Sequence, residues 1–440
     1  MSPDASLTPP GSHGATPANS PRDAQLAPGD IAVGVVIGRA SEYFDFFVFG
    51  IASVLVFPTV FFPFADRLHG ILYAFTVFAT AFVARPLGTL AGMAAQRRFG
   101  RGVKLTAALF LLGTATVTMA LLPGYATSGE LAIVLLVACR IAQGIALGAS
   151  WDGLPSLLAM NAAPNRRGWY AMLGQLGAPL GFVIACALFA FLWSSLDAKD
   201  FYEWGWRYPF FAAFAINVVA LFARLRLVVT HEYERALESR ELEPCDVREL
   251  FKEQGGNVFI GAFAALASYA LFHLVTIFPL SWVMLYSQQE LGGFFRIELV
   301  GAVLAAIAMP VSGWVSDRIG RRKMLAAAAI AIAIFSLAAP WLLGGGGNGP
   351  KAFILVGDVL LGLSYAQAAG SVTSNFLPRF RYTGAALTAD LAWLIGAAFA
   401  PLVALALSAR FGLGALSVYL LSGAVCTLVA LRTNFVAGEL

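Results

Sequence analysis

The sequence predicts an all-α membrane protein with about twelve transmembrane helices, arranged as two bundles of six. Of its 440 residues, 59% are hydrophobic and 12% are charged, whereas soluble domains carry roughly 25% charged residues. Each crossing needs roughly 20 mostly apolar residues to cover a hydrocarbon core of about 30 Å. The apolar segments are too long and too numerous for one buried core, so the chain length goes into membrane spans.

Apolar runs separated by short polar segments predict where the chain crosses the membrane. We expect spans at 31–59, 69–94, 104–122, 131–158, 168–194, 207–226, 257–286, 294–316, 323–343, 352–376, 383–408 and 413–433. Residues 224–256 form the one long polar stretch between them, with charges of alternating sign that suit an exposed helical connector. This pattern predicts an N-terminal bundle over 31–226, a cytoplasmic linker over 227–256 and a C-terminal bundle over 257–433.

The distribution of basic residues predicts the orientation. Residues 1–29 are rich in Pro, Ser, Ala and Gly and contain no apolar run, which indicates a disordered cytoplasmic tail rather than a signal peptide. With this tail inside, most of the 29 Lys and Arg residues fall in the predicted cytoplasmic connections. Basic residues favour the cytoplasmic side of a membrane protein. We therefore expect a multi-pass protein of the bacterial inner membrane with both termini in the cytoplasm.

Two similar motifs follow the second and the eighth predicted spans. The first is RRFGRG at 97–102 and the second is GWVSDRIGRR at 313–322. Each lies in the cytoplasmic loop after the second span of its group of six. This repeat resembles the architecture of the major facilitator superfamily, in which two six-helix halves flank a substrate site near the midplane.

Further segments resemble the metabolite:proton symporter branch of that superfamily. They are EYFDF at 42–46, FFP at 61–63, RPLG at 85–88, WGWRYPF at 204–210 and PRFRYTG at 378–384. The resemblance implies alternating access and proton-coupled uptake of a small metabolite. The branch carries carboxylates, aromatic acids and zwitterionic solutes.

Two departures from the family pattern bear on the candidate site, one in a cytoplasmic loop and one in a membrane span. Arg97 stands where the first-half motif carries Asp, which puts the usual gating contact of this half in doubt. In the fourth span, Arg140 to Gly144 resembles the RxxQG motif associated with proton coupling, but Ser150 replaces the Glu that follows it. Asp152 is a candidate to supply the missing carboxylate.

The first predicted span carries three charged residues at middle depth. Arg39, Glu42 and Asp45 step by three along the helix and therefore line one side of it. A charge near the bilayer centre costs roughly 2.5–3.5 kcal/mol on insertion scales, and such residues persist when they pair, face water or act. Two carboxylates one turn apart in a low dielectric do not both ionise cheaply. We expect Glu42 and Asp45 to carry the proton with Arg39 as their counter-ion; the alternative is a purely structural ion cluster.

The remaining candidates are assigned by chemistry and position. Arg140 is suited to bind a carboxylate bidentately or to act on a neighbouring carboxyl group, and structural pairing with Asp152 is the alternative. We assign proton coupling to Glu42, Asp45, Asp152 and Arg140. We assign substrate binding to Arg39, Arg140, Gln143, Tyr43, Trp151, His273 and Asp390. We assign gating to Arg85, Asp317, Arg318 and Arg321. For His273 and the aromatic residues, plain packing is the competing interpretation.

The sequence favours a secondary active transporter, a proton-coupled symporter of a small polar, carboxylate-bearing metabolite. The segment GAPLG at 177–181 resembles the antiporter motif of the superfamily and keeps a proton-driven exporter open. A metabolite sensor that moves nothing is a weaker alternative. No catalytic or metal-ligand constellation stands out, the four cysteines are scattered, and the basic residues form no nucleic-acid stripe. We expect no enzyme activity, cofactor, metal or nucleic acid, and a monomer whose partners are substrate, protons and lipid.

Overall fold

The computed structural model describes residues 28–151, 153, 162–228, 243–287, 290–368 and 376–433, and these residues form helices without a β-strand. Within them, 11 helical segments are long and apolar enough to cross a membrane. Helix α1 (Pro28–Leu55) is the twelfth crossing, although Arg39, Glu42 and Asp45 interrupt its apolar sequence. Its 28 residues span about 42 Å, which exceeds the hydrocarbon thickness.

The N-terminal six crossings contain both long helices and short connecting turns. They are α1, α3 (Arg67–Phe99), α4 (Arg101–Leu121), α6 (Glu130–Ala149), α8 (Arg167–Leu173) continued by α9 (Gly177–Ser195), and α11 (Tyr208–Val228). The short helices α2 (Phe57–Val60), α5 (Tyr125–Ser128) and α10 (Ala198–Glu203) lie in the connections.

The C-terminal six crossings are more often broken. They are α13 (Val247–Ala264) with α14 (Leu266–Thr276) and α15 (Phe278–Tyr286), then α16 (Leu291–Ile319), α17 (Arg321–Gly344), α18 (Gly349–Ala368), α20 (Arg381–Ala392) with η4 (Trp393–Ala398) and α21 (Ala400–Phe411), and α22 (Gly414–Thr433). The element η4 is a π-helix. Such local widening of a helix is frequent at functional sites.

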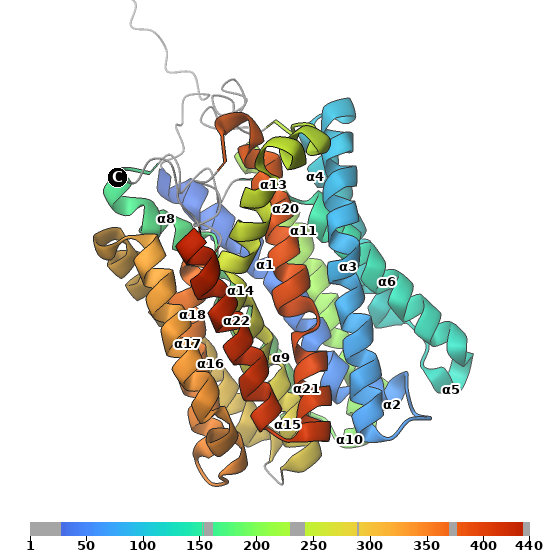
Figure 1. Cartoon of the computed structure of the whole chain (residues 1–440). Coiled ribbons are helices and arrows are strands. Elements are labelled where there is room, and N and C mark those ends of the chain that lie inside the picture. Colours follow the sequence, from blue (N-terminus) through green and yellow to red (C-terminus); the bar gives the residue numbers. More distant parts are fainter. Residues whose placement is uncertain are drawn as a thin grey trace, which may run out of the picture.

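The two halves meet along two seams that run across the molecule (Figure 1). On one side, α3 packs against α20, η4 and α21; on the other, α8 and α9 pack against α16. Helices α1 and α14 lie between the seams, and the aromatic rings of Phe47 and Phe272 stack there with centroids 5.5 Å apart. Residues along these seams therefore form the contacts between the two halves.

Several helix ends differ from the predicted spans. The fourth span was predicted over 131–158, but α6 ends at Ala149. The seventh was predicted to begin at 257, but α13 begins at Val247, inside the predicted linker, and carries a non-helical residue at Gln254. An Asp at the N-cap explains the early start, since the side chain of Asp246 accepts the N–H groups of Arg248 and Glu249. Residues 1–27 of the predicted tail and residues 229–242 of the predicted linker lie outside the described residues.

Glycines bring α3 and α6 into backbone contact. A Cβ atom at Gly88 would lie 2.1 Å from the carbonyl oxygen of Ile145, and one at Gly148 would lie 2.1 Å from the carbonyl oxygen of Arg85. A Cβ at Gly144 would lie 2.2 Å from the carbonyl oxygen of Ala81. Small residues permit this close approach between membrane helices. The contact fixes the positions of the charged residues on both helices.

A second glycine contact joins α1 to α9. A Cβ atom at Gly177 would lie 2.5 Å from the backbone nitrogen of Ala40, and one at Gly181 would lie 2.6 Å from that of Phe44. The GAPLG segment thus has a packing role against the charged helix α1.

Candidate functional site

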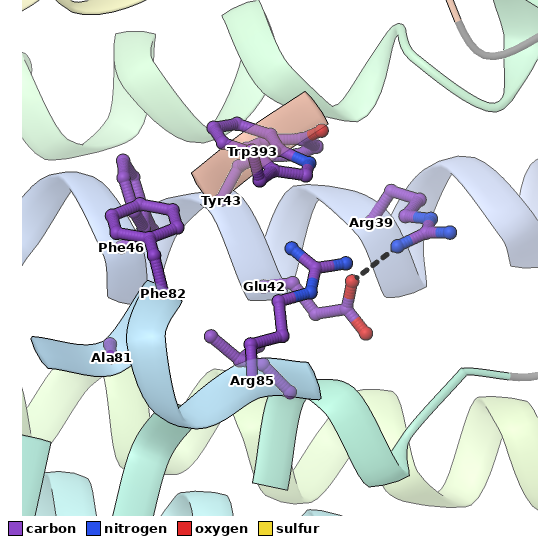
Figure 2. Close-up of a pocket in the computed structure, with 9 residues that line it drawn as sticks. Arg39, Glu42, Tyr43, Phe46, Ala81, Phe82, Arg85 and Trp393 are labelled. Atoms are coloured by element: carbon purple, nitrogen blue, oxygen red, sulfur yellow. Dashed lines mark hydrogen bonds and ion pairs between the residues drawn. The ribbon is translucent and has the colours of Figure 1, made fainter. Parts of the chain in front are cut away.

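A small cavity lies at the centre of the molecule, between α1, α3 and α6 of the first half and η4 of the second (Figure 2). Its lining residues are Arg39, Glu42, Tyr43, Phe46, Ala81, Phe82, Arg85, Leu147 and Trp393. Its volume of about 40 Å³ has room for a few water molecules, because one water needs roughly 10–15 Å³ on the same measure. The structure therefore shows a contracted state of this central space.

Charged groups gather on one side of the cavity. Arg39 donates to Glu42 over 2.8 Å, and Arg85 lines the same cavity (Figure 2). Ser150 Oγ donates to Glu42 Oε1 over 3.4 Å, so the residue that replaces the family's Glu is a partner of Glu42. Two cations and one anion thus line a space that both halves enclose.

Arg85 also connects the two halves. Its Nε lies 2.8 Å from Oδ1 of Asp390, a residue of α20. The hydroxyl of Thr89, one turn along α3, donates to Oδ2 of Asp390 over 2.5 Å. Asp390 is only 3% exposed, so this pair is shielded from water. Asp390, predicted to bind substrate, is here the partner of Arg85 behind the cavity wall.

Aromatic rings also line the cavity. Phe82 of α3 stacks on Trp393 of η4 with centroids 5.6 Å apart and planes 18° apart. The hydroxyl of Tyr43 is hydrogen-bonded to that of Tyr365 on α18. These rings offer an apolar surface beside the arginine side chains, with the guanidinium carbon of Arg85 5.9 Å from the ring centre of Trp393. Such a lining suits an amphipathic small molecule.

Asp45 belongs to a separate network that does not line the cavity. It accepts Thr116 Oγ1 of α4 at 3.0 Å and Gln143 Nε2 of α6 at 3.2 Å. Arg140 donates to the carbonyl oxygen of the Gln143 side chain over 2.9 Å. Gln143 therefore bridges Asp45 and Arg140. We expected Glu42 and Asp45 to act as one pair, but the turn between them directs Glu42 to the cavity and Asp45 to α4 and α6.

Arg140 is enclosed by aromatic rings. Its guanidinium carbon lies 4.0 Å from the ring centre of Phe49 and 5.0 Å from that of Phe78, at distances where the rings attract a cation. Its Nε donates to the carbonyl oxygen of Phe78, and its Nη2 has no hydrogen-bond partner within the described part of the chain. Asp152, the predicted alternative partner, lies outside the described residues.

His273 and Trp151 occupy different environments. His273 is fully buried and stacks on Phe46 with centroids 5.0 Å apart; neither of its ring nitrogens is hydrogen-bonded to any residue that the structure describes. It lies behind the cavity wall rather than in it. Trp151 follows the C-terminal end of α6, near the start of α4. Its carbonyl oxygen accepts hydrogen bonds from Lys104 Nζ at 2.6 Å and from the hydroxyl of Tyr382 at 2.9 Å.

The loop motif of the second half joins the two halves at the end where α8 begins. Asp317 accepts the backbone N–H groups of Gly168 at 2.6 Å and Trp169 at 3.1 Å. These groups belong to the first turn of α8, whose orphan N–H groups favour a negative charge. Gln367 of α18 donates to the carbonyl oxygen of Gly168 over 3.2 Å. The predicted gating residue Asp317 thus bridges the halves.

The other predicted gating residues contact their own half or the adjoining seam. Arg318 lies over the ring of Trp314, 3.6 Å from its centre, within α16. Arg321 begins α17. In the first half, the exposed Arg97 stands in place of the motif Asp, and Lys104 instead crosses the seam to the hydroxyl of Tyr382 at 2.9 Å.

Replacing Asp317 by Asn is expected to weaken closure at this end. The substitution removes the charge that two backbone N–H groups of α8 stabilise, an effect of about 0.5–2 kcal/mol, so open states should gain roughly 2- to 30-fold in population. Distances between spin labels at Arg167→Cys and Lys323→Cys, with the native cysteines replaced, report the opening. Arg432→Gln, which removes an exposed charge from the last turn of α22, is the control and should leave the distances unchanged. Equal distances in all variants would show that Asp317 does not hold this end closed.

Comparisons with known proteins agree with this architecture. Residues 35–345 match the Major Facilitator Superfamily. The inner membrane metabolite transport protein YhjE of Escherichia coli (strain K12) is 35% identical over 91% of this chain and 92% of its own length. The citrate-proton symporter of Klebsiella pneumoniae is 28% identical over 90% of this chain and 89% of its own.

The fold is also that of a solved transporter. The crystal structure of a D-xylose-proton symporter superposes with a TM-score of 0.69 over 93% of this chain and 98% of that chain, at 19% sequence identity. At this identity the likeness concerns the fold alone. The family match covers most of the chain, and the metabolite transport relative covers nearly all of it. The chain belongs to the major facilitator superfamily of membrane transporters.

Proposed function

We propose that this protein is a proton-coupled symporter of a small monocarboxylate that has an apolar or cyclic body. The single observation that carries the proposal is the ion pair of Arg39 and Glu42 on the wall of a central cavity between the two halves. The family is one of transporters, and a relative named as a citrate-proton symporter couples its cargo to protons. The cargo class is argued below from the charges of the cavity.

The charges around the cavity are balanced in this state. Arg39 is paired with Glu42, and Arg85 is paired with Asp390. A substrate anion that enters while both pairs are intact adds an unbalanced charge in a low-dielectric space, where each uncompensated charge is costly. A proton on Glu42 removes that obstacle, because the positive charge of Arg39 then balances the negative charge of the substrate.

The exchange of partners by Arg39 couples the proton to the cargo. Protonated Glu42 releases Arg39, and the guanidinium group binds the substrate carboxylate through two parallel hydrogen bonds. Phe82 and Trp393 then pack against the apolar part of the substrate. One proton on Glu42 makes one positive charge available for the cargo. The cavity therefore balances a substrate that carries a single negative charge.

The Asp45, Gln143 and Arg140 network supports this site from behind. Because Asp45 follows Glu42 by one turn on α1, its contacts with α4 and α6 fix the rotation of α1 and hence the direction of Glu42. Arg140 supplies the positive charge that balances Asp45 through Gln143. We propose that this network responds to the protonation of Glu42 on α1, and that Arg39 is the arginine that contacts the substrate.

The two halves then rock around the cavity. We propose that the bundles over 31–226 and 257–433 move as units, with both termini and the linker over 227–256 in the cytoplasm, in keeping with the distribution of basic residues. The Arg85–Asp390 pair and the Asp317 contact with α8 must both separate for the α8 end to open.

A binding screen tests the cargo and the role of Arg39. Purified protein is heated with shikimate, benzoate, citrate or betaine at acidic and at neutral pH, and its melting temperature is recorded. We expect the cyclic monocarboxylates to raise the melting temperature most, and more at acidic pH. Arg39→Ala should weaken that binding by about 10- to 100-fold, because a hydrogen bond to a charged group contributes about 1.5–3 kcal/mol.

The control variant is Arg410→Ala, in which an exposed arginine near the end of α21 is removed. It should bind like the unmodified protein. Stabilisation by betaine alone, or equal loss of binding in both variants, would contradict the assignment of a carboxylate cargo to Arg39.

A further inference from the structure

A second pair of acidic residues lies inside the C-terminal half, away from the central cavity. Glu298 is on α16 and Asp358 is at the middle of α18; each is 1% exposed. Both helices pack closely, and a Cβ atom at Gly301, one turn after Glu298, would lie 2.1 Å from Oδ2 of Asp358. Because residues three apart share one face of a helix, Glu298 lies on the face of α16 that packs against Asp358.

Neither carboxyl group has a hydrogen-bond partner among the described residues. All four of their oxygen atoms are buried. Among the described residues, no Lys, Arg or His acts electrostatically on either group. The titratable group that faces the pair from the first half is the thiol of Cys186 on α9. This pair therefore differs from Glu42 and Asp390, which have arginine partners.

Asp358 also lines a cavity that both halves enclose. The first half contributes Phe47 of α1 with Pro179 and Phe182 of α9, and the second half contributes Thr276 and Tyr365. The cavity volume is about 10 Å³, which is about the size of one water molecule. Any motion that separates α9 from α16 would widen this space beside Asp358.

A proton is the occupant that this environment suits. Two ionised carboxylates without a cation in a dry interior would each carry a desolvation penalty of several kcal/mol and would repel each other. A metal ion such as Mg²⁺ or Ca²⁺ requires six or more oxygen ligands, whereas the lining beside Asp358 is mostly apolar. One added proton neutralises a carboxyl group with no further ligands.

We infer that Glu298 and Asp358 form a second proton-binding site, in which each carboxyl group holds a proton while the halves are closed and exchanges it when the cavity at α9 opens. The site is separate from Glu42 in position and partners. It rests on the contact between α16 and α18 and on the cavity shared with α9, and it does not depend on the identity of the cargo. Neither residue belongs to the charged wall described above.

Infrared spectroscopy of the full chain in lipid tests the inference directly. The carboxylic-acid C=O band of the unmodified protein is compared at about pH 7 with that of the double variant Glu298→Gln/Asp358→Asn. We expect the difference spectrum to show a protonated carboxyl group that the double variant lacks. Replacing sodium chloride by choline chloride should not change it.

Two controls keep the result decisive. Glu290→Gln removes a carboxyl group exposed at the start of α16 and should remove ionised carboxylate signal only. The double variant should melt at or above the temperature of the unmodified protein, because neutral amides replace groups that are already neutral. A carboxylate band in place of the acid band, or an acid band that vanishes when sodium is added, would overturn the inference. Loss of cargo binding alone would concern the proposed function and not this site.

Discussion

Replacing Glu42 by Gln should abolish proton-driven accumulation while leaving exchange of substrate for substrate intact. Glutamine mimics the protonated carboxyl group, so the charge of residue 42 no longer competes with the cargo for Arg39 at any pH. The variant should bind substrate with the same affinity at acidic and neutral pH, whereas the unmodified protein should bind more weakly as pH rises. Accumulation in proteoliposomes should fall from the level set by the proton gradient to simple equilibration.

The matched control is Glu130→Gln, which removes an exposed carboxyl group at the start of α6. It should accumulate substrate like the unmodified protein. Counterflow, in which unlabelled substrate inside drives entry of labelled substrate, should persist in Glu42→Gln. If Glu42→Gln still accumulates substrate against its gradient, the coupling proton is carried elsewhere.

The second large effect concerns folding. Gly144→Ala should strongly reduce the amount of folded protein, because the added methyl group would lie 2.2 Å from a backbone oxygen of α3 and 2.7 Å from the Cα of Ala81. Backbone atoms cannot move aside as a flexible side chain does, so α3 and α6 must separate. Overpacking typically costs about 1–3 kcal/mol and sometimes more, and here it also displaces Arg85.

Gly102→Ala provides the same chemical change without the contact. Gly102 lies in α4, where an added Cβ would meet nothing within 4 Å. This variant should match or slightly exceed the unmodified protein, since alanine favours a helix interior over glycine by roughly 0.5–1 kcal/mol. The folded fraction is measured by size-exclusion chromatography of detergent extracts after heating. Equal yields from the two variants would contradict the tight α3–α6 contact.

The fold followed from features that act locally along the chain. Long apolar runs and their polar separators predicted the spans, and the twelve-helix architecture is confirmed by the family match and the solved neighbour. The helix ends were less predictable because they depend on caps. The start of α13 at Val247 is set by the side chain of Asp246, which a hydropathy pattern does not register.

The site was harder to predict because it depends on helix rotation and on contacts between halves. Arg39 and Glu42 were expected together and their ion pair is present, since both lie on one turn of the same helix. The separation of Asp45 from Glu42 depends on Thr116, a residue of another helix that carries no sequence signal. The functional assignments of all these residues remain predictions.

Several residues of the seams and the interior were missed for the same reason. Tyr382 appeared only as part of a family signature, although its hydroxyl joins α20 to the first half. Glu298 was not among the predicted site residues, although it lies within the predicted eighth span over 294–316. The helix begins at Leu291 and buries Glu298 beside Asp358. An unpaired carboxylate within an apolar helix was the available signal.

The central claim is that a proton enters together with the cargo because Arg39 changes carboxylate partners. Its most direct test follows labelled monocarboxylate and internal pH at the same time in proteoliposomes with no initial gradient of either. The account predicts that substrate entry acidifies the lumen, and that an imposed inward proton gradient drives substrate uptake above equilibrium. Entry of substrate without acidification, or with alkalinisation as in proton-driven export, would contradict it.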